Sequence, residues 1–183
     1  MNKFNIPYVV VISLILLASF SRIIPHIPNF TPIGAMALFG GAYLKNRYHA
    51  FLIPIASLWF SDLVINNFIY SFYSDFTWFY SGFLWQYLSF VLIILIGHFF
   101  LKKLSIKSVF FTTISSSLLF FIVTNFGVWI SGTMYPLDFQ GLTTCYVMAL
   151  PFYKGTLLGF IVYSTFLFGI LEFSKIKFQI LKI

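Results

Sequence analysis

The stretch that decides the fold is 33–47, IGAMALFGGAYLKNR, a short apolar run that ends in a basic pair. Its apolar part, 33–44, would rise only about 18 Å as a helix, which is too short to cross a hydrocarbon core of about 30 Å. The run is rich in small residues, and Ala37 and Gly41 have the spacing that lets two helix backbones approach closely. We therefore predict a short second helix that is enclosed by other helices, with a re-entrant loop as the alternative.

The composition around this stretch is that of a membrane protein. Hydrophobic residues make up 60% of the chain and charged residues 8%, whereas soluble domains have about 25% charged residues. No basic stripe is interleaved with aromatic residues on a polar segment, so the net charge of +7 does not indicate nucleic-acid binding. The single cysteine, Cys145, cannot form an internal disulfide, and no His/Cys cluster has the spacing of a metal or haem site. We expect no metal and no cofactor.

Basic residues fall at every second break between the apolar runs, and they set the expected orientation. Nine of the eleven follow this pattern: Lys3 before the first run, Lys45 and Arg47 after the second, Lys102, Lys103 and Lys107 after the fourth, and Lys175, Lys177 and Lys182 after the last. The intervening loops contain Asp75 and Asp138 instead. Because Lys and Arg resist translocation, this alternation predicts that both termini are cytoplasmic.

The sequence therefore predicts an all-α integral membrane protein, a single domain over 1–183 with six transmembrane helices. The expected spans are about 6–24, 33–44, 50–72, 80–101, 108–130 and 151–173. Between the last two, 131–150 is expected to be external and to close with a short helix on the membrane surface. An alternative is that the first run is a signal peptide cleaved near Ala18–Ser21, which would leave five spans.

Polar side chains inside these spans mark the candidate site. Asp62 falls at the predicted bilayer centre, where a carboxylate costs at least about 2.5–3.5 kcal/mol and needs a partner. The other candidates come from further spans and mostly occupy their outer halves: Arg22, Asn66, Gln86, Asn125, Trp129 and Lys154. Together they suit a small organic solute with a planar ring and an anionic group. Three prolines between Pro25 and Pro32 predict an ordered loop over this site, with Pro25, His26, Pro28 and Asn29 as its lid.

Each candidate also has a structural interpretation. Asp62 and Arg22 are expected to pair with each other if neither binds a ligand. Lys154 is close enough to the interface to extend into the headgroups, Asn125 is suited to bond another helix, and Trp129 is typical of an aromatic belt. An enzyme is the weaker hypothesis, because Asp62 has no second membrane aspartate and no Gly-x-Ser-x-Gly turn is present.

Two longer stretches carry a family resemblance. The first is 22–43, RIIPHIPNFTPIGAMALFGGAY, followed by Ser61-Asp62-Leu63. The second is Asn125-Phe-Gly-Val-Trp129, followed by Tyr135-Pro136 and Ala149-Leu-Pro-Phe152. Together they resemble an uncharacterised family of small bacterial six-span membrane proteins. The pattern is similar, more distantly, to the substrate-specificity (S) subunits of energy-coupling factor transporters.

The resemblance implies a protein of the bacterial cytoplasmic membrane that takes up a small, vitamin-like solute from outside. It further implies a coupling subunit and ATPases as partners, which agrees with the lack of a nucleotide-binding Gly-x-x-x-x-Gly-Lys-Ser/Thr loop here. The first span lacks the Ala-x-x-x-Ala pair with which many such subunits dock. The alternative function is a non-transport membrane protein, either an assembly partner of a larger membrane complex or a lipid-modifying enzyme.

Overall fold

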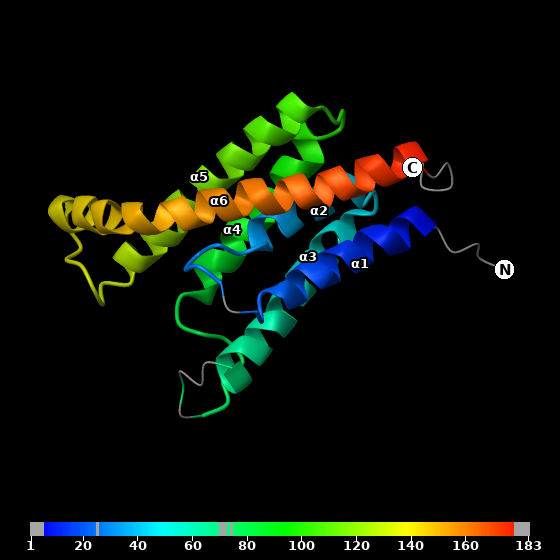
Figure 1. The fold of residues 1–183 in the computed structure, drawn as a ribbon. Coiled ribbons are helices and arrows are strands. Elements are labelled where there is room, and N and C mark those ends of the chain that lie inside the picture. The colour runs from blue at the N-terminus through cyan, green and yellow to red at the C-terminus, as the bar shows by residue number, and fades with distance from the viewer. Residues whose placement is uncertain (1–5, 25, 70–72, 74, 178–183) are drawn as a thin grey trace.

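A computed structural model of the protein describes residues 6–24, 26–69, 73 and 75–177. This part of the chain consists of helices and loops, without a strand (Figure 1). The helices are α1 (Ile6–Ser21), α2 (Ile33–Tyr43), α3 (Arg47–Val64), the π-helix η1 (Ile65–Ile69), α4 (Phe83–Phe100), α5 (Ile106–Ile130) and α6 (Phe139–Lys177). The predicted all-α fold with a short second helix is therefore confirmed. Pro25 of the predicted lid and residues 70–72 of the predicted third span lie outside the described residues.

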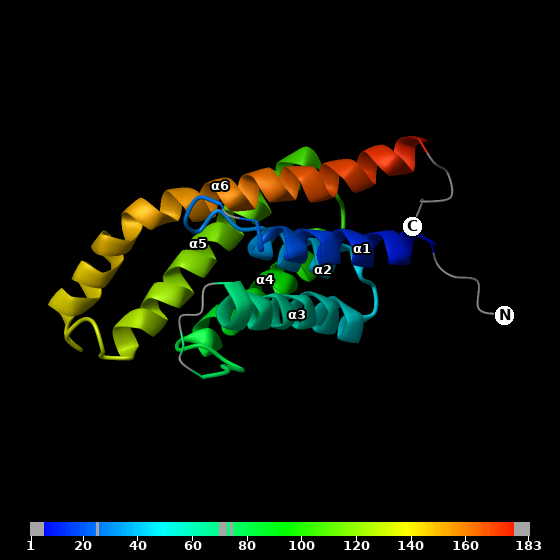
Figure 2. The ribbon, with the colours of Figure 1, turned by 60° about the horizontal axis from the view of Figure 1, so that its bottom comes forward.

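Four helical segments in the described part are long and apolar enough to cross a membrane: α3 with η1, α4, α5 and α6. Their length and composition are those of membrane-spanning helices, in agreement with the predicted membrane protein. Helices α1 and α2 are apolar but shorter. The start of α1 and the end of α6 lie at the same end of the bundle (Figures 1 and 2). The full six-span topology and its orientation remain predictions.

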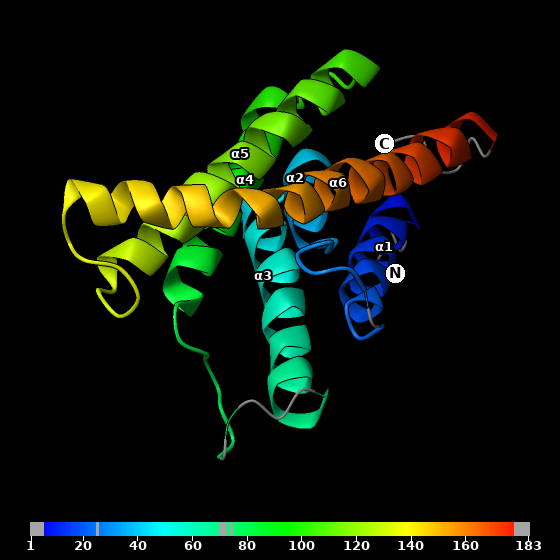
Figure 3. The same ribbon diagram turned by 60° about the vertical axis from the view of Figure 1, so that its left-hand side comes forward.

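Helix α2 is the centre of the bundle. It contacts each of the other five α-helices, and Figures 1 and 3 show it with α4 and α5 on one side and α1 on the other. Ten of its eleven residues are buried. A helix that is apolar or small on every face is stable only when protein or lipid surrounds all of them. The sequence of α2 thus fits a helix with no exposed face.

Glycines let α2 and α4 approach to backbone contact. A Cβ atom built on Gly41 would lie 2.2 Å from the carbonyl oxygen of Ile94, and one on Gly97 would lie 2.3 Å from that of Leu38. Real Cβ atoms do not come this close to backbone atoms, so neither position accepts a side chain without moving a helix. The small-residue signal in the second run therefore marks a helix crossing, as its spacing indicated.

Helix α6 differs from the prediction. We expected a separate surface helix before a span at 151–173, but the structure has one continuous helix, Phe139–Lys177, of 39 residues. Pro151 lies inside it, and Figure 2 shows α6 bending between its yellow first part and its orange middle. A proline removes one backbone hydrogen bond and kinks a helix without always ending it. The helix also begins earlier than expected, at Phe139, directly after Asp138, whose carboxylate accepts a hydrogen bond from the Gly141 N–H at 2.6 Å.

The third span also departs from a regular helix. After Val64 the chain continues as η1, a π-helical turn that contains Asn66 and Asn67. A π-helix has about 4.4 residues per turn, so residues four apart no longer share a face across this boundary. Asn67 uses its side chain to hold the following loop: it donates to the Thr77 carbonyl at 2.9 Å and accepts from the Thr77 N–H at 2.6 Å. The Asn67 carboxamide thus ties the loop to the end of the third span.

Candidate functional site

A cavity of about 170 Å³ lies at the N-terminal end of α2. Because α2 begins only at Ile33, no helix fills the middle of the bundle beyond its N-terminal end. The loop before α2 and the surrounding helices enclose the cavity there. Polar groups and aromatic rings share its lining: Arg22, Asn29, Thr31, Ile33, Gly34, Gln86, Phe90, Phe120, Thr156 and Phe160. The cavity is smaller than the roughly 300–1,000 Å³ typical of drug-sized ligands. This volume suits a compact solute.

Arg22, at the end of α1, is the charged group of this cavity. Its Nη1 forms an ion pair with Oδ1 of Asp62 on α3 at 2.7 Å and donates to the Ser61 hydroxyl. Both charged side chains are largely buried, with 10% and 7% of their surface exposed. Tyr87 on α4 donates to the other carboxylate oxygen of Asp62 at 3.0 Å. The predicted Arg22–Asp62 pairing is confirmed, and Asp62 lies behind Arg22, outside the cavity lining.

Arg22 has further hydrogen-bond donors besides Nη1. A guanidinium has five N–H donors in a fixed planar fork, and both interactions described above use Nη1. Nε is buried without a hydrogen-bond partner among the described residues. A buried unpaired donor is unfavourable, and a carboxylate or carbonyl oxygen is the kind of acceptor that would satisfy it. The site is therefore equipped to hold an anionic or carbonyl-bearing molecule.

The predicted lid loop closes over this region against α6. A Cβ atom on Gly155 would lie 2.3 Å from the Pro28 carbonyl oxygen, and one on Gly159 would lie 2.9 Å from the Thr31 backbone nitrogen. The loop thus rests in a notch formed by two glycines one turn apart. Asn29 turns the chain here with a φ of 61°, a left-handed conformation that Asn tolerates better than most residues.

The other lid residues lie in different places. Asn29 lines the cavity, whereas Pro28 is exposed. Nδ1 of His26 lies 3.0 Å from the Ile27 carbonyl oxygen, which can only accept a hydrogen bond.

The structure brings only part of the predicted ligand set together. Gln86 lines the cavity with Arg22. Asn66, on η1, does not line it, and Lys154 is exposed on α6. The Asn125 amide donates to the Phe121 carbonyl of its own helix at 2.8 Å, and Trp129 Nε1 donates to the Pro136 carbonyl at 2.9 Å. Asn125 and Trp129 therefore bond to the protein backbone, and ligand contact by these four residues stays a prediction.

Sequence reasoning missed several lining groups. Thr31 and Thr156 line the cavity with hydroxyl-bearing side chains, and Phe120 and Phe160 line it with rings whose centroids are 6.1 Å apart. Gly34 is part of the same arrangement, because a Cβ atom there would overlap the Phe160 ring at 1.8 Å. The small-xxx-small spacing of Gly155 and Gly159 was the readable signal that α6 accepts a backbone here. An isolated threonine in an apolar run gives no comparable signal.

Comparisons with known proteins give a family without an assigned activity. No curated protein and no solved structure shows significant similarity to this chain. The expected likeness to transporter S subunits is thus not shown, whereas membership of an uncharacterised family is. Over residues 2–181 the sequence matches a family of unknown function, DUF6580, and the chain belongs to this family.

Proposed function

We propose that this membrane protein captures a small anionic solute in the cavity beside Arg22. The observation that carries the proposal is the position of Arg22: this residue lines the cavity, while the carboxylate that balances its charge, Asp62, lies outside the lining. A ligand in the cavity therefore meets the cation first. A pre-formed concave site with a few convergent polar groups among apolar walls is the usual form of a small-molecule site.

The neighbouring groups support recognition of more than charge. Gln86 and Asn29 supply carboxamides, and Thr31 and Thr156 supply hydroxyls, around one small volume. The rings of Phe90, Phe120 and Phe160 give flat apolar walls. A compact molecule with an acidic group and a planar or apolar body would satisfy both kinds of surface.

We propose uptake from outside the cell as the role of this capture. The charge alternation of the sequence assigns the Arg22 end of the bundle to the exterior of a bacterial cytoplasmic membrane. Transporter S subunits, which the sequence resembles, have a proline-bearing loop after the first helix that covers their site. The cavity of this protein lies beside a loop of the same kind. In such a system a separate coupling subunit and ATPases supply the energy.

The test is mass spectrometry of small molecules released by denaturing the detergent-purified protein. The variants Gln86→Leu and Thr156→Val remove polar groups from the cavity but leave the Arg22–Asp62 pair intact. Gln140→Leu and Thr144→Val are matched controls, because Gln140 and Thr144 are exposed on α6 away from the cavity. We expect a near-stoichiometric acidic compound from the wild type and from both controls.

Both cavity variants should release at least about tenfold less of this compound, since an unmet hydrogen bond to a buried polar group costs about 1–3 kcal/mol. Circular dichroism and gel filtration establish that the variants are folded. The proposal is wrong if no released compound depends on Gln86 and Thr156.

A further inference from the structure

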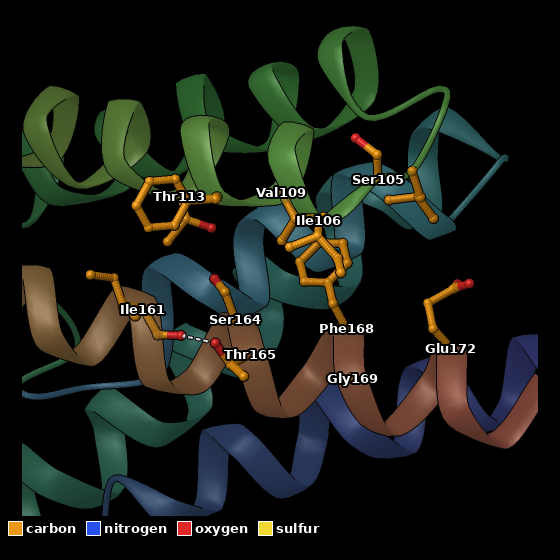
Figure 4. Close-up of a pocket in the computed structure, with 12 residues that line it drawn as sticks. Ser105, Ile106, Val109, Thr113, Ile161, Ser164, Thr165, Phe168, Gly169 and Glu172 are labelled. Atoms are coloured by element: carbon orange, nitrogen blue, oxygen red, sulfur yellow. Dashed lines mark hydrogen bonds between the residues drawn. The ribbon is translucent and has the colours of Figure 1, made fainter.

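A second, larger hollow lies between α5 and α6, at the opposite end of the bundle from Arg22. Its volume is about 410 Å³, and it shares no lining residue with the first cavity. Figure 4 shows it as a groove between the first turns of α5 and the second half of α6. Apolar side chains dominate its walls, among them Ile106, Val109 and Phe168. Gly169 opens it further, because a Cβ atom there would meet nothing within 4 Å.

Two hydroxyls on the groove lining have no partner. Thr113 on α5 and Ser164 on α6 are each only 2% exposed, and their hydroxyl oxygens make no hydrogen bond to a described residue. Figure 4 shows Ser164 directed from α6 into the space between the helices. Its neighbour Thr165 behaves differently and donates to the Ile161 carbonyl of its own helix at 2.8 Å. Buried hydroxyls are normally paired, so both side chains would gain from turning toward an acceptor in the groove.

Two exposed lysines lie next to groove-lining residues in the sequence. Lys103 and Lys107 are exposed and flank the lining residues Leu104, Ser105 and Ile106. The carboxylate at the mouth, Glu172, is already engaged: Lys175 lies 2.9 Å from it and Tyr43 donates to it at 2.5 Å. The mouth is therefore net positive, and basic pockets between transmembrane helices on the cytoplasmic side are sites for anionic lipid headgroups.

We propose that this groove binds one anionic phospholipid from the leaflet on the Lys103 side. Its phosphate would face Lys103 and Lys107, and an acyl chain would lie along Ile106, Val109 and Phe168. The ester carbonyls of a phospholipid lie between its phosphate and its acyl chains. Thr113 is six residues beyond Lys107, about 9 Å along the helix, so the carbonyls would come toward the unpaired hydroxyls as acceptors. This proposal is independent of the solute cavity.

The test measures lipid binding by native mass spectrometry of the detergent-purified chain, titrated with phosphatidylglycerol and, separately, with phosphatidylcholine of the same acyl chains. The charge variant is Lys103→Gln/Lys107→Gln. Its matched control is Lys45→Gln/Arg47→Gln, which removes two exposed cations, one from the loop after α2 and one from the first position of α3. The groove-filling variant is Gly169→Leu, and its control is Ser115→Leu, at an exposed α5 position outside the groove.

We expect one phosphatidylglycerol to bind in preference to phosphatidylcholine. Two lysines near an anionic headgroup contribute roughly 2 kcal/mol, so the charge variant should weaken phosphatidylglycerol binding about thirtyfold, and the control double variant should do so far less. Gly169→Leu should abolish binding of this lipid, and Ser115→Leu should not. Equal weakening by the two double variants would overturn the proposal. So would an integral protein that co-purifies with the wild type and is lost in Gly169→Leu without any phosphatidylglycerol preference.

Discussion

The two ends of α2 differ in their surroundings. At its C-terminal end, Gly41 brings α2 into backbone contact with α4, and Tyr43 is bonded to Glu172 of α6. At its N-terminal end, Ile33 and Gly34 form part of the wall of the cavity. The short helix is thus packed against α4 near its C-terminal end and borders the solute cavity at its N-terminal end. The space exists because the helix is too short to fill the depth of the bundle.

The same contrast appears in the charges. Each end has a carboxylate that accepts a hydrogen bond from a tyrosine and pairs with a cation: Asp62 with Tyr87 and Arg22, and Glu172 with Tyr43 and Lys175. The Asp62 side chain is 7% exposed, whereas that of Glu172 is 46% exposed. Water can solvate Glu172 if its partner is lost, but it cannot reach Asp62 as easily. The two ion pairs should therefore differ greatly in what their loss costs.

The largest expected effect comes from the packed end of α2. Gly41→Leu should prevent the protein from folding, because its side chain would overlap the α4 backbone at Ile94, which no rotamer change can relieve. Gly169→Leu makes the same substitution where a Cβ atom meets nothing within 4 Å, and it should leave the protein folded. Gel filtration and thermal unfolding in detergent measure both. A folded Gly41→Leu protein as stable as Gly169→Leu would show that α2 and α4 are not in backbone contact.

The next effect compares the two ion pairs. Arg22→Met leaves Asp62 as an unpaired buried carboxylate, and it should lower the free energy of unfolding by about 3–5 kcal/mol. Lys175→Met removes the equivalent cation beside a half-exposed carboxylate and should cost only about 0–1 kcal/mol. Reversible unfolding in detergent gives both values.

A double variant checks the cause of this difference. In Arg22→Met/Asp62→Leu no charge is left unpaired, so the double variant should be more stable than Arg22→Met alone. If Arg22→Met costs no more than Lys175→Met, the two ends do not differ in the way described here.

The sequence was sufficient for the features that depend on composition and on spacing. The small residues of 33–44 predicted an enclosed short helix, and the cost of a carboxylate in an apolar run predicted a partner for Asp62. It was not sufficient where a local irregularity of the backbone determines the direction of a side chain or the length of a helix. The π-turn at Ile65–Ile69 changes which face Asn66 occupies, and Pro151 kinks α6 without ending it. Neither outcome follows from periodicity, since both are local irregularities of the helix backbone.

The candidate site shows the same division. Arg22 and Gln86 line one cavity, as their depth suggested. Asn125 and Trp129 were expected at the same depth, but each bonds to a backbone carbonyl, of Phe121 and Pro136 respectively. A polar residue in a membrane helix satisfies its donors on its own backbone as readily as on a ligand. The position of such a residue in the sequence predicts its depth in the membrane, but it does not predict the direction in which the side chain points.

The proposed solute site requires that the cavity beyond α2 is open to the exterior and favours anions. Cysteine labelling on intact cells measures both properties. The native Cys145 is 2% exposed and would be replaced by alanine. In that background, Thr156→Cys places a thiol on the cavity lining, Ser116→Cys places one at a fully buried position, and Thr144→Cys places one at an exposed position.

The measurement compares the labelling rates of an anionic and a cationic methanethiosulfonate of similar size, neither of which crosses the membrane. We predict that Thr156→Cys reacts with both reagents faster than Ser116→Cys. It should also prefer the anionic reagent more strongly than Thr144→Cys does, because Arg22 faces the cavity. Labelling of Thr156→Cys that is as slow as that of Ser116→Cys, or faster with the cationic reagent, would contradict the account.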